Sequence, residues 1–282
     1  MLIFKTTETI QSYLSRCASK GEKIGFVPTM GALHEGHLSL IRRALKENEV
    51  AVTSIFVNPM QFNDKRDLER YPRTIDSDLE KLVSVGCHVL FYPDTKEIYP
   101  DDTTVKVNME FGYLLDTMEA VYRKGHFEGV AQVVKRLLDI VQPHSLYMGQ
   151  KDYQQLLVVK KMVESLNLKV DLIMCPTIRE PDGLAMSSRN VLLTPEQRKA
   201  AAEIPKTLFR AMEKIQDTSL QKVQQESIKA LNSNPLLETE YFEIVDADNL
   251  KPLKENNETH TIAICNAVKI GNVRLIDNIL IA

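Results

Sequence analysis

Runs of residues typical of β-strands alternate with amphipathic helical patterns through more than half of this chain. Strand patterns fall at Lys23–Thr29, Val50–Val57, Val89–Tyr92, Ser145–Met148 and Lys169–Cys175, and helical patterns lie between them at His37–Lys46, Asp76–Ser84, Val130–Ile140 and Gln154–Leu166. The run VAVTSIFV is continuously apolar, as expected for a strand that is covered on both faces. The alternation predicts an α/β fold, a Rossmann-like doubly wound parallel sheet.

The pattern changes after Thr177, where helices and then strands follow in blocks. Thr194, Pro195 and Gln197 are typical of a helix start, and Pro205 is expected to kink that helix. A second helix is predicted at Ser219–Leu231, with strands at Thr239–Val245, Thr259–Val268 and Val273–Ile281. We therefore expect two domains, one at 1–177 and a smaller α+β domain at 178–282 that acts as a lid.

Composition excludes several classes of protein. The net charge of −3 is a poor match to a protein held mainly by nucleic-acid phosphates. No run reaches the roughly 18 apolar residues of a transmembrane helix, and the first ten residues lack the apolar core of a signal peptide. The four cysteines lie at least 70 residues apart, too far for a short metal-binding motif. We expect a cytoplasmic protein that binds neither membrane nor nucleic acid.

The most informative motif, PTMGALHEGH, lies where the first predicted strand turns into the first helix. A helix start offers unpaired backbone N–H groups to an anion, and the imidazoles of His34 and His37 can donate to phosphate oxygens. A zinc-protease helix needs histidines one turn apart, but Leu38 stands at the required position. A Walker loop fails as well, because His37 and Leu38 replace its lysine and hydroxyl residue. The remaining alternative is an exposed polar loop.

Three further segments carry polar groups suited to a nucleotide or a hydroxy acid. Met186–Arg189 combines two hydroxyls with a guanidinium, which binds phosphate in a bidentate manner; the alternative is a solvated interdomain loop. Lys151 and Asp152 follow a strand and could contact phosphate and ribose, or simply be the charged start of a helix. Gln61 follows the buried strand Val50–Val57. Strand ends are where ligands bind in such sheets.

These segments together resemble one enzyme family. The His34-x-Gly36-His37 pair and the Met186–Arg189 loop are similar to the two nucleotide signatures of the class I aminoacyl-tRNA synthetase and nucleotidyltransferase superfamily. More narrowly, PTMGALHEGHLSL, SIFVNPMQF, YPRT, FEGVAQVVKRL, GQKDYQQ and REPDGLAMSSRN resemble the pantoate–β-alanine ligase family. These blocks run from about residue 27 to 190.

The resemblance implies a reaction, a set of ligands and a set of residues. Pantoate would be activated by ATP as pantoyl adenylate with release of pyrophosphate, and β-alanine would then displace AMP to form pantothenate. Mg²⁺ is the implied cofactor and a homodimer the implied assembly. The implied catalytic residues are His37, His34, Lys151 and Arg189. The implied ATP contacts are Met30, Gly31, Ala32, Leu33, His34, Glu35, Gly36, His37, Gly149, Gln150, Lys151, Asp152, Ile178, Met186, Ser187, Ser188 and Arg189, and the implied pantoate and β-alanine contacts are Gln61 and Gln155.

Other functions remain as alternatives at this point. A nucleotide-binding regulator without catalysis would not need phosphate donors on three separate segments. A tRNA synthetase would need a basic RNA-binding domain, and the chain shows none. A nucleotidyltransferase that joins AMP to a phosphate would need cations near Gln61 and Gln155, where the residues are mostly neutral. The other histidines, His88, His126, His144 and His260, are expected to take no part in ATP binding.

Overall fold

The computed structural model describes residues 1–62, 65–100, 107, 109–255 and 261–281. The chain divides into two compact units. The first unit consists of Met1–Phe111, Tyr122–Gly149 and Val158–Pro176, and the second of Gly112–Val121, Gln150–Leu157 and Thr177–Ala282.

A six-stranded sheet forms the centre of the first unit, and every pair of neighbouring strands in it is parallel. Its strands are β1 (Leu2–Phe4), β2 (Ile24–Thr29), β3 (Val50–Ile55), β4 (Val89–Phe91), β5 (Ser145–Gly149) and β6 (Asp171–Cys175), in the order β1-β4-β3-β2-β5-β6. The order reverses direction between β2 and β5. In an open α/β sheet such a reversal leaves a crevice at the carboxyl ends of the two strands, where ligands bind.

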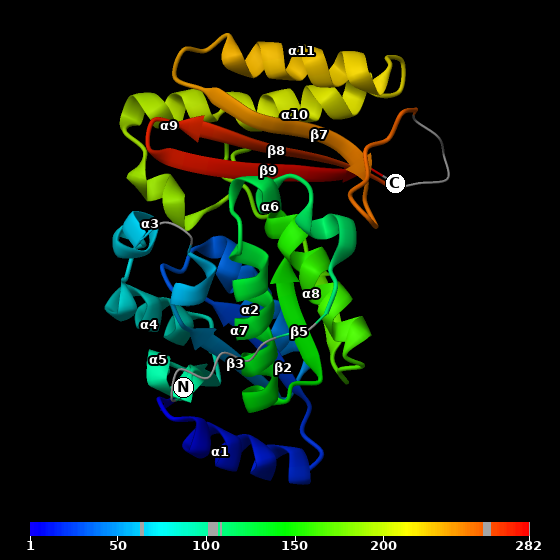
Figure 1. The fold of residues 1–282 in the computed structure, drawn as a ribbon. Helices are drawn as coiled ribbons and strands as arrows, with labels where there is room; N and C mark the ends of the chain where they lie inside the picture. Colours follow the sequence, from blue (N-terminus) through cyan, green and yellow to red (C-terminus); the bar gives the residue numbers. More distant parts are fainter. Residues whose placement is uncertain (63–64, 101–106, 108, 256–260, 282) are drawn as a thin grey trace. The chain divides into compact units, whose positions relative to one another are not determined.

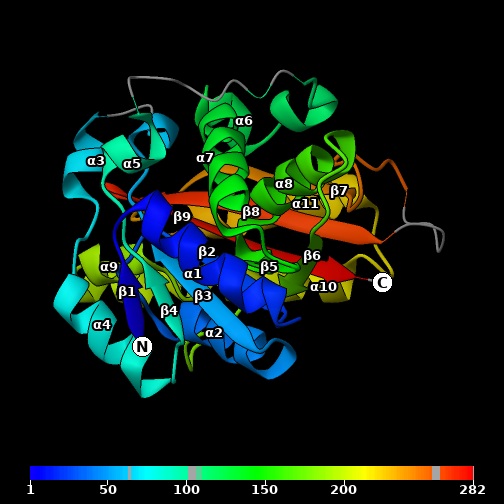
Figure 2. The ribbon, with the colours of Figure 1, turned by 90° about the horizontal axis from the view of Figure 1, so that it is seen from below.

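Helices cover both faces of this sheet, as the sequence pattern predicts for a doubly wound fold. The helices of the first unit are α1 (Thr7–Ser19), α2 (Glu35–Glu47), α3 (Lys65–Arg70), α4 (Ile75–Ser84), α5 (Thr95–Ile98) and α7 (His126–Val141), and two helices, α6 (Glu119–Tyr122) and α8 (Tyr153–Ser165), contain residues of both units. Figure 2 shows α1 and α7 on one face of the sheet and α2 and α4 on the other. Ile41 of α2 and Leu82 of α4 pack in one core with Val27 and Leu90 of the strands.

The second unit is built on an antiparallel sheet of β7 (Glu238–Asp246), β8 (Ile262–Ile270) and β9 (Val273–Ile281). Its helices are α9 (Pro195–Ala201), α10 (Glu203–Lys214) and α11 (Leu220–Asn232). Figure 1 shows α10 and α11 lying along these strands. Alternate residues of the strands, among them Phe242, Ile264 and Leu275, pack against Leu208 of α10 and Val223 of α11 to form the core.

The expected elements are present, with shifts of a few residues at their ends. The sequence analysis assigned nothing before Lys23, where the structure has β1 and α1. The expected strand start at Thr259 lies outside the described residues, and β8 is described from Ile262. The helix disruption expected at Pro205 is present: the helix is interrupted at Ala202, because Pro205 has no N–H to donate to the Ala201 carbonyl, and Pro205 lies in the first turn of α10. A proline is tolerated there because first-turn N–H groups have no intrahelical partner.

The predicted helix start at Thr194 is confirmed in detail. Its hydroxyl accepts the backbone N–H of Gln197, and the Gln197 side chain accepts the N–H of Thr194 in return. Among the helices that the structure describes, none is long and apolar enough to cross a membrane.

Candidate functional site

The predicted site residues lie on both units. The first unit contains Met30–His37, Gln61 and Gly149, and the second contains Gln150–Asp152, Gln155, Ile178 and Met186–Arg189. In the first unit, Met30 directly follows β2 and Gly149 is the last residue of β5. These are the two strands at which the sheet order reverses, so both segments start at the crevice expected for a ligand.

The loop between β2 and α2 is held by a buried carboxylate. Asp78 of α4, only 1% exposed, accepts the backbone N–H of Ala32 at 2.9 Å and that of Leu33 at 2.7 Å. Gly31 has a φ of +79°, and a Cβ atom there would stand 3.1 Å from the Asp78 carboxylate. Asp78 therefore holds the backbone of the loop that leads into the start of α2.

His34 and His37 cap the start of α2 with their side chains. Nδ1 of His34 accepts the N–H of Gly36 at 3.2 Å, and Nδ1 of His37 accepts the N–H of His34 at 3.3 Å. The two ring centroids are 4.1 Å apart. Because each Nδ1 acts as an acceptor, the proton of each neutral ring lies on Nε2, which is then a hydrogen-bond donor.

Gln61 is fixed on both its side chain and its backbone. Its Nε2 contacts the Met30 sulfur at 2.9 Å, and its Oε1 accepts from Nδ2 of Asn58 at 3.3 Å. Its carbonyl oxygen lies 2.8 Å from Nδ1 of His126, whose Nε2 is 3.0 Å from an Arg123 guanidinium nitrogen. A guanidinium can only donate, so the His126 proton lies on Nδ1 and is donated to Gln61. His126 thus supports a predicted substrate residue, a role that the sequence analysis did not find.

The approach of α7 to Gln61 depends on a glycine. A Cβ atom at Gly129 would lie 2.3 Å from the Met60 carbonyl oxygen and 2.9 Å from the Gln61 Cα atom. The carbonyl oxygen of Gly129 also accepts from Nδ2 of Asn58 at 3.1 Å. Asn58 in turn accepts from the hydroxyl of Tyr99 at 3.0 Å. Gln61, the last residue of the 3-10 helix η1 (Pro59–Gln61) that follows β3, is therefore held by contacts from Asn58 and α7.

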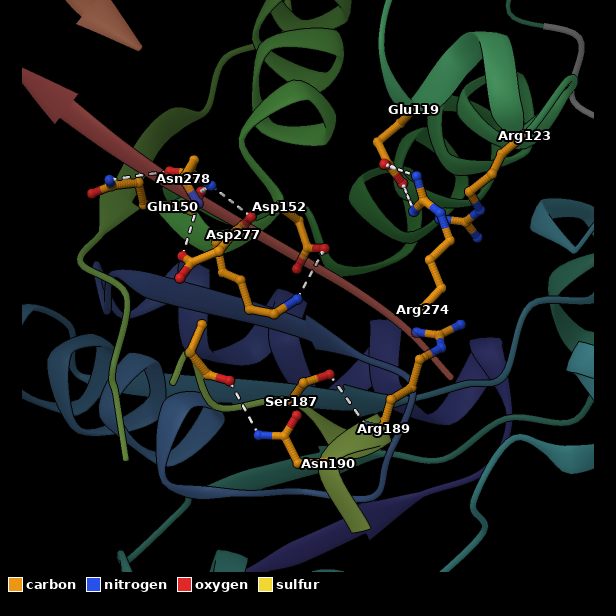
Figure 3. Close-up of polar contacts among 12 residues, drawn as sticks. Glu119, Arg123, Gln150, Asp152, Ser187, Arg189, Asn190, Arg274, Asp277 and Asn278 are labelled. Atoms are coloured by element: carbon orange, nitrogen blue, oxygen red, sulfur yellow. Dashed lines mark hydrogen bonds and ion pairs between the residues drawn. The ribbon is translucent and has the colours of Figure 1, made fainter. Parts of the chain in front are cut away.

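In the second unit, the segment Gln150–Asp152 forms a short 3-10 helix, η4. Nζ of Lys151 lies 3.6 Å from Oδ1 of Asp152, and its side chain is largely buried. The side chain of Asn278 in β9 holds the backbone of this turn, as Figure 3 shows. Gln155 follows on α8 and is half-buried.

The predicted phosphate loop follows a small hairpin in the second unit. Arg179 and Ala185 pair as an isolated bridge, and the Met186 N–H donates to the Ile178 carbonyl at 3.0 Å, so two predicted ATP contacts lie side by side. Ser187 then caps the 3-10 helix η5 (Ser188–Leu192) by accepting the N–H of Arg189 at 3.2 Å.

The base of this hairpin is anchored by a buried ion pair, between Arg179 and Asp277 of β9. Burial raises the pKa of the Asp277 carboxyl, and the hydrogen bond from Arg179 opposes that rise. Two buried oxygens beside the loop, Oγ1 of Thr177 and Oδ1 of Asn190, make no hydrogen bond within the described residues.

Taken together, these groups suit a polyphosphate and a small polar acid. The donors are imidazole Nε2 atoms, an ammonium and a guanidinium, which stabilise charge on phosphate oxygens. The Gln61 amide is neutral and suits hydroxyl groups. Within the described residues, no three His, Cys, Asp or Glu side chains gather where they could hold a metal ion. Mg²⁺ commonly binds through substrate phosphates with few protein ligands, and such a site needs no cluster of that kind.

Comparisons with known proteins cover nearly the whole chain. A family model described as pantoate-beta-alanine ligase matches residues 2–280. The chain is 46% identical to a pantothenate synthetase of Azobacteroides pseudotrichonymphae over 99% of both chains, and 45% identical to one of Porphyromonas gingivalis over the same share. A Thermus thermophilus pantothenate synthetase structure has a TM-score of 0.92 at 41% identity over 99% of both chains. A Francisella tularensis ligase complexed with β,γ-ATP and β-alanine has a TM-score of 0.82 at 38% identity over 99% of this chain and 97% of the other.

Proposed function

The chain belongs to the pantoate–β-alanine ligase family, and on that premise we propose that it forms pantothenate through a pantoyl adenylate. It is an ATP-dependent ligase. In the first step a carboxylate oxygen of pantoate bonds to the α-phosphorus of ATP, and the bond to the bridging oxygen breaks with pyrophosphate as the leaving group. In the second step the amine of β-alanine bonds to the acyl carbon, AMP leaves, and the amine loses a proton.

Charge stabilisation is the main task of the protein in the first step. Negative charge builds on the oxygens of the α-phosphorus and on the leaving pyrophosphate. Nε2–H of His34 and His37, with Lys151 and Arg189, supplies donors for these oxygens. The substrate carboxylate is itself the nucleophile, so no nucleophilic side chain is required.

Gln61 and Gln155 bind pantoate, and Gln61 also faces β-alanine. A buried amide that an incorrect acid leaves unpaired costs about 1–3 kcal/mol, which gives selectivity for the hydroxyls of pantoate. The rigid support of Gln61 by Asn58 and His126 favours this role, because a fixed amide loses little entropy on binding.

ATP arrives as its Mg²⁺ complex. The metal supplies charge neutralisation on the triphosphate, whose oxygens provide most of its ligands. Asp152, beside Lys151 in η4, is the one carboxylate among the predicted ATP contacts of the second unit and would be its candidate ligand for the metal. His34, His37, Lys151 and Arg189 would donate to the phosphate oxygens that do not bind the metal.

The observation that carries the proposal is the pair of histidines capping α2 at the point where the sheet order reverses. Their Nδ1 atoms cap the helix start, and histidine is a residue type whose ring N–H can donate to an anion, at a place where ligands bind in this fold. We also propose a homodimer, and a reducing compartment such as the cytoplasm, with which four buried free thiols are compatible.

Isotope exchange tests the proposed reaction order. With pantoate present and β-alanine absent, labelled pyrophosphate should enter ATP, because adenylate formation is reversible. Omitting pantoate, or replacing it with an acid that lacks its hydroxyls, is the matched control and should abolish the exchange. Formation of ADP and phosphate in place of AMP and pyrophosphate would overturn the proposal.

A further inference from the structure

Two consecutive residues of β9, Asp277 and Asn278, hold two segments that lie far from them and from each other in the sequence. Both residues are 3% exposed. Successive side chains of a strand point to opposite faces of the sheet, so the two residues serve segments on different faces of β9. One segment ends in Lys151 and the other leads into Ser187–Arg189.

Asn278 binds the η4 turn with its whole carboxamide. Its Nδ2 donates to the carbonyl of Gln150 at 3.0 Å and to that of Lys151 at 2.8 Å, and its Oδ1 accepts from Nε2 of Gln150 at 3.2 Å. Only an amide offers two donors and an acceptor in this arrangement. Because the carbonyl of Lys151 is one of the partners, Asn278 sets where the Lys151 side chain begins.

Asp277 binds the base of the hairpin through Arg179. The guanidinium donates to both carboxylate oxygens, at 2.6 and 2.9 Å, and also to the Gly183 carbonyl at 3.0 Å and the Asn278 carbonyl at 3.2 Å. It lies 5.2 Å from the centroid of the Phe209 ring. Arg179 therefore ties both strands of the hairpin to β9, and the Ser187–Arg189 loop leaves this hairpin after Met186.

We propose that Asp277 and Asn278 are positioning residues that hold Lys151 and Arg189 at a constant separation, so that both reach the phosphates of one ATP. This inference rests on the proposed function, because it assumes that Lys151 and Arg189 contact ATP. Asn278 acts through the backbone of Lys151, and Asp277 acts through Arg179 and the hairpin. Neither touches a substrate.

A double-mutant cycle between Asn278 and Lys151 tests the proposal. Asn278→Asp keeps the size and the acceptor but loses both donated bonds, and turns a carboxylate toward two carbonyl oxygens. We expect the kcat of pantoate-dependent pyrophosphate exchange to fall about 10²-fold, as for a misplacement of about 1 Å. In a Lys151→Ala background the same change should cost less than about threefold, because the side chain that Asn278 positions is gone.

Asn266→Ala is the matched control. Asn266 is a fully buried asparagine of the neighbouring strand β8, paired in register with Asp277, and its amide makes no hydrogen bond within the described residues. Its loss can change the thermal midpoint but should leave the exchange rate as in the wild type. Asn278→Ser, which keeps a small polar side chain, replaces the aspartate variant if that variant does not fold.

The outcomes separate this inference from the proposed function. Equal fold losses from the Asn278 change in both backgrounds would show that Asn278 does not act through Lys151, and would overturn the inference alone. A Lys151→Ala protein with wild-type exchange would overturn both the inference and the assigned role of Lys151. In the cycle between Asp277→Asn and Arg189→Ala, the fold losses in exchange rate should likewise be smaller together than their product. If the two losses multiply fully, Asp277 does not act through Arg189, and only Asn278 is a positioning residue.

Discussion

Nδ1 of His37 accepts the backbone N–H of His34 at 3.3 Å, so the second histidine of the motif caps the backbone of the first. His34 in turn accepts the N–H of Gly36 at 3.2 Å. A serine or aspartate could satisfy the same backbone groups. Neither a serine nor an aspartate side chain has a second group, like the histidine ring Nε2–H, that can donate a hydrogen bond while the first group caps the helix. Histidine at both positions therefore fits a helix start that is capped by side chains and that we propose as an anion site.

His37→Ala should lose turnover and keep substrate affinity. Removal of one donor that stabilises charge in the transition state costs about 10²–10³ in kcat. Loss of the cap should lower the free energy of unfolding by about 1 kcal/mol. His88→Ala is the control. Nδ1 of His88 also accepts a backbone N–H, that of Ala51 at 3.2 Å, but His88 lies at the amino ends of the strands, away from the edge of the sheet where ligands bind. Steady-state kinetics giving equal turnover for both variants would refute the role of His37.

Asp78→Ala should weaken ATP binding and stability together. The change leaves the buried N–H groups of Ala32 and Leu33 unpaired, at about 1–3 kcal/mol each. We expect urea unfolding to show this loss and the KM for ATP to rise more than that for β-alanine. Asp78→Asn keeps one oxygen acceptor and should show a smaller effect. Asp76→Ala, on the exposed face of the same helix, is the control. A folded Asp78→Ala protein with an unchanged KM for ATP would contradict the idea.

Gly129→Ala should affect pantoate in particular. The added methyl group would lie 2.3 Å from the Met60 carbonyl oxygen, so the turn that carries Gln61 must move. We expect the KM for pantoate to rise about tenfold or more, with a smaller change in that for ATP. Glu128→Ala, at the exposed neighbouring position on α7, should behave as the wild type. Equal changes in both KM values would mean that the defect is general.

ATP should protect the loop Pro181–Asn190 from amide exchange or proteolysis. A ligand shifts an equilibrium only through contacts that it makes better in one state, and the guanidinium of Arg189 matches phosphate oxygens. Arg189→Ala should lose this protection and release AMP without pantothenate, because the adenylate is then less well shielded from water. Equal protection of the wild-type loop with and without ATP would show that the loop is already fixed.

Tyr99 should make the protein less stable at alkaline pH. Burial raises the pKa of Tyr99 to about 12 from 10.0. Above pH 10 the unfolded chain loses this proton first, so the native state binds more protons and the free energy of unfolding falls as pH rises toward 12. Below pH 10 the group has no such effect.

Tyr99→Phe removes this ionisation, so its stability should fall less steeply with pH over the same range. Urea unfolding at several pH values measures the slope. Tyr122→Phe, at a tyrosine that is 46% exposed, is the control and should keep the wild-type slope. A Tyr99→Phe protein with the wild-type slope would show that another group controls alkaline unfolding; Tyr153, whose pKa burial also raises to about 12, would be tested next.

Local patterns in the sequence were sufficient for the parallel sheet, the antiparallel sheet and the cap at Thr194. Strand and helix periodicity, and a capping box, depend on residues within a few positions of one another, so they can be read directly from the chain. The two histidines of the α2 start are only three residues apart, and their position after a strand already predicted an anion site. The strand β1 was missed because its three residues carry little periodicity. Helix α1 was missed as well, although its thirteen residues place Ile10, Leu14 and Cys17 on one buried face.

Only the tertiary structure showed which distant residues hold this site in place. Asp78 reaches the Ala32 backbone across 46 positions, and Asn278 reaches Lys151 across 127. Nothing in the local pattern marks either residue, because their hydrogen bonds depend on which helix or strand packs beside the loop. The sequence alone determined the kinds of chemical group present, and packing of distant segments decided their positions, because buried polar groups must find partners wherever the fold brings them together.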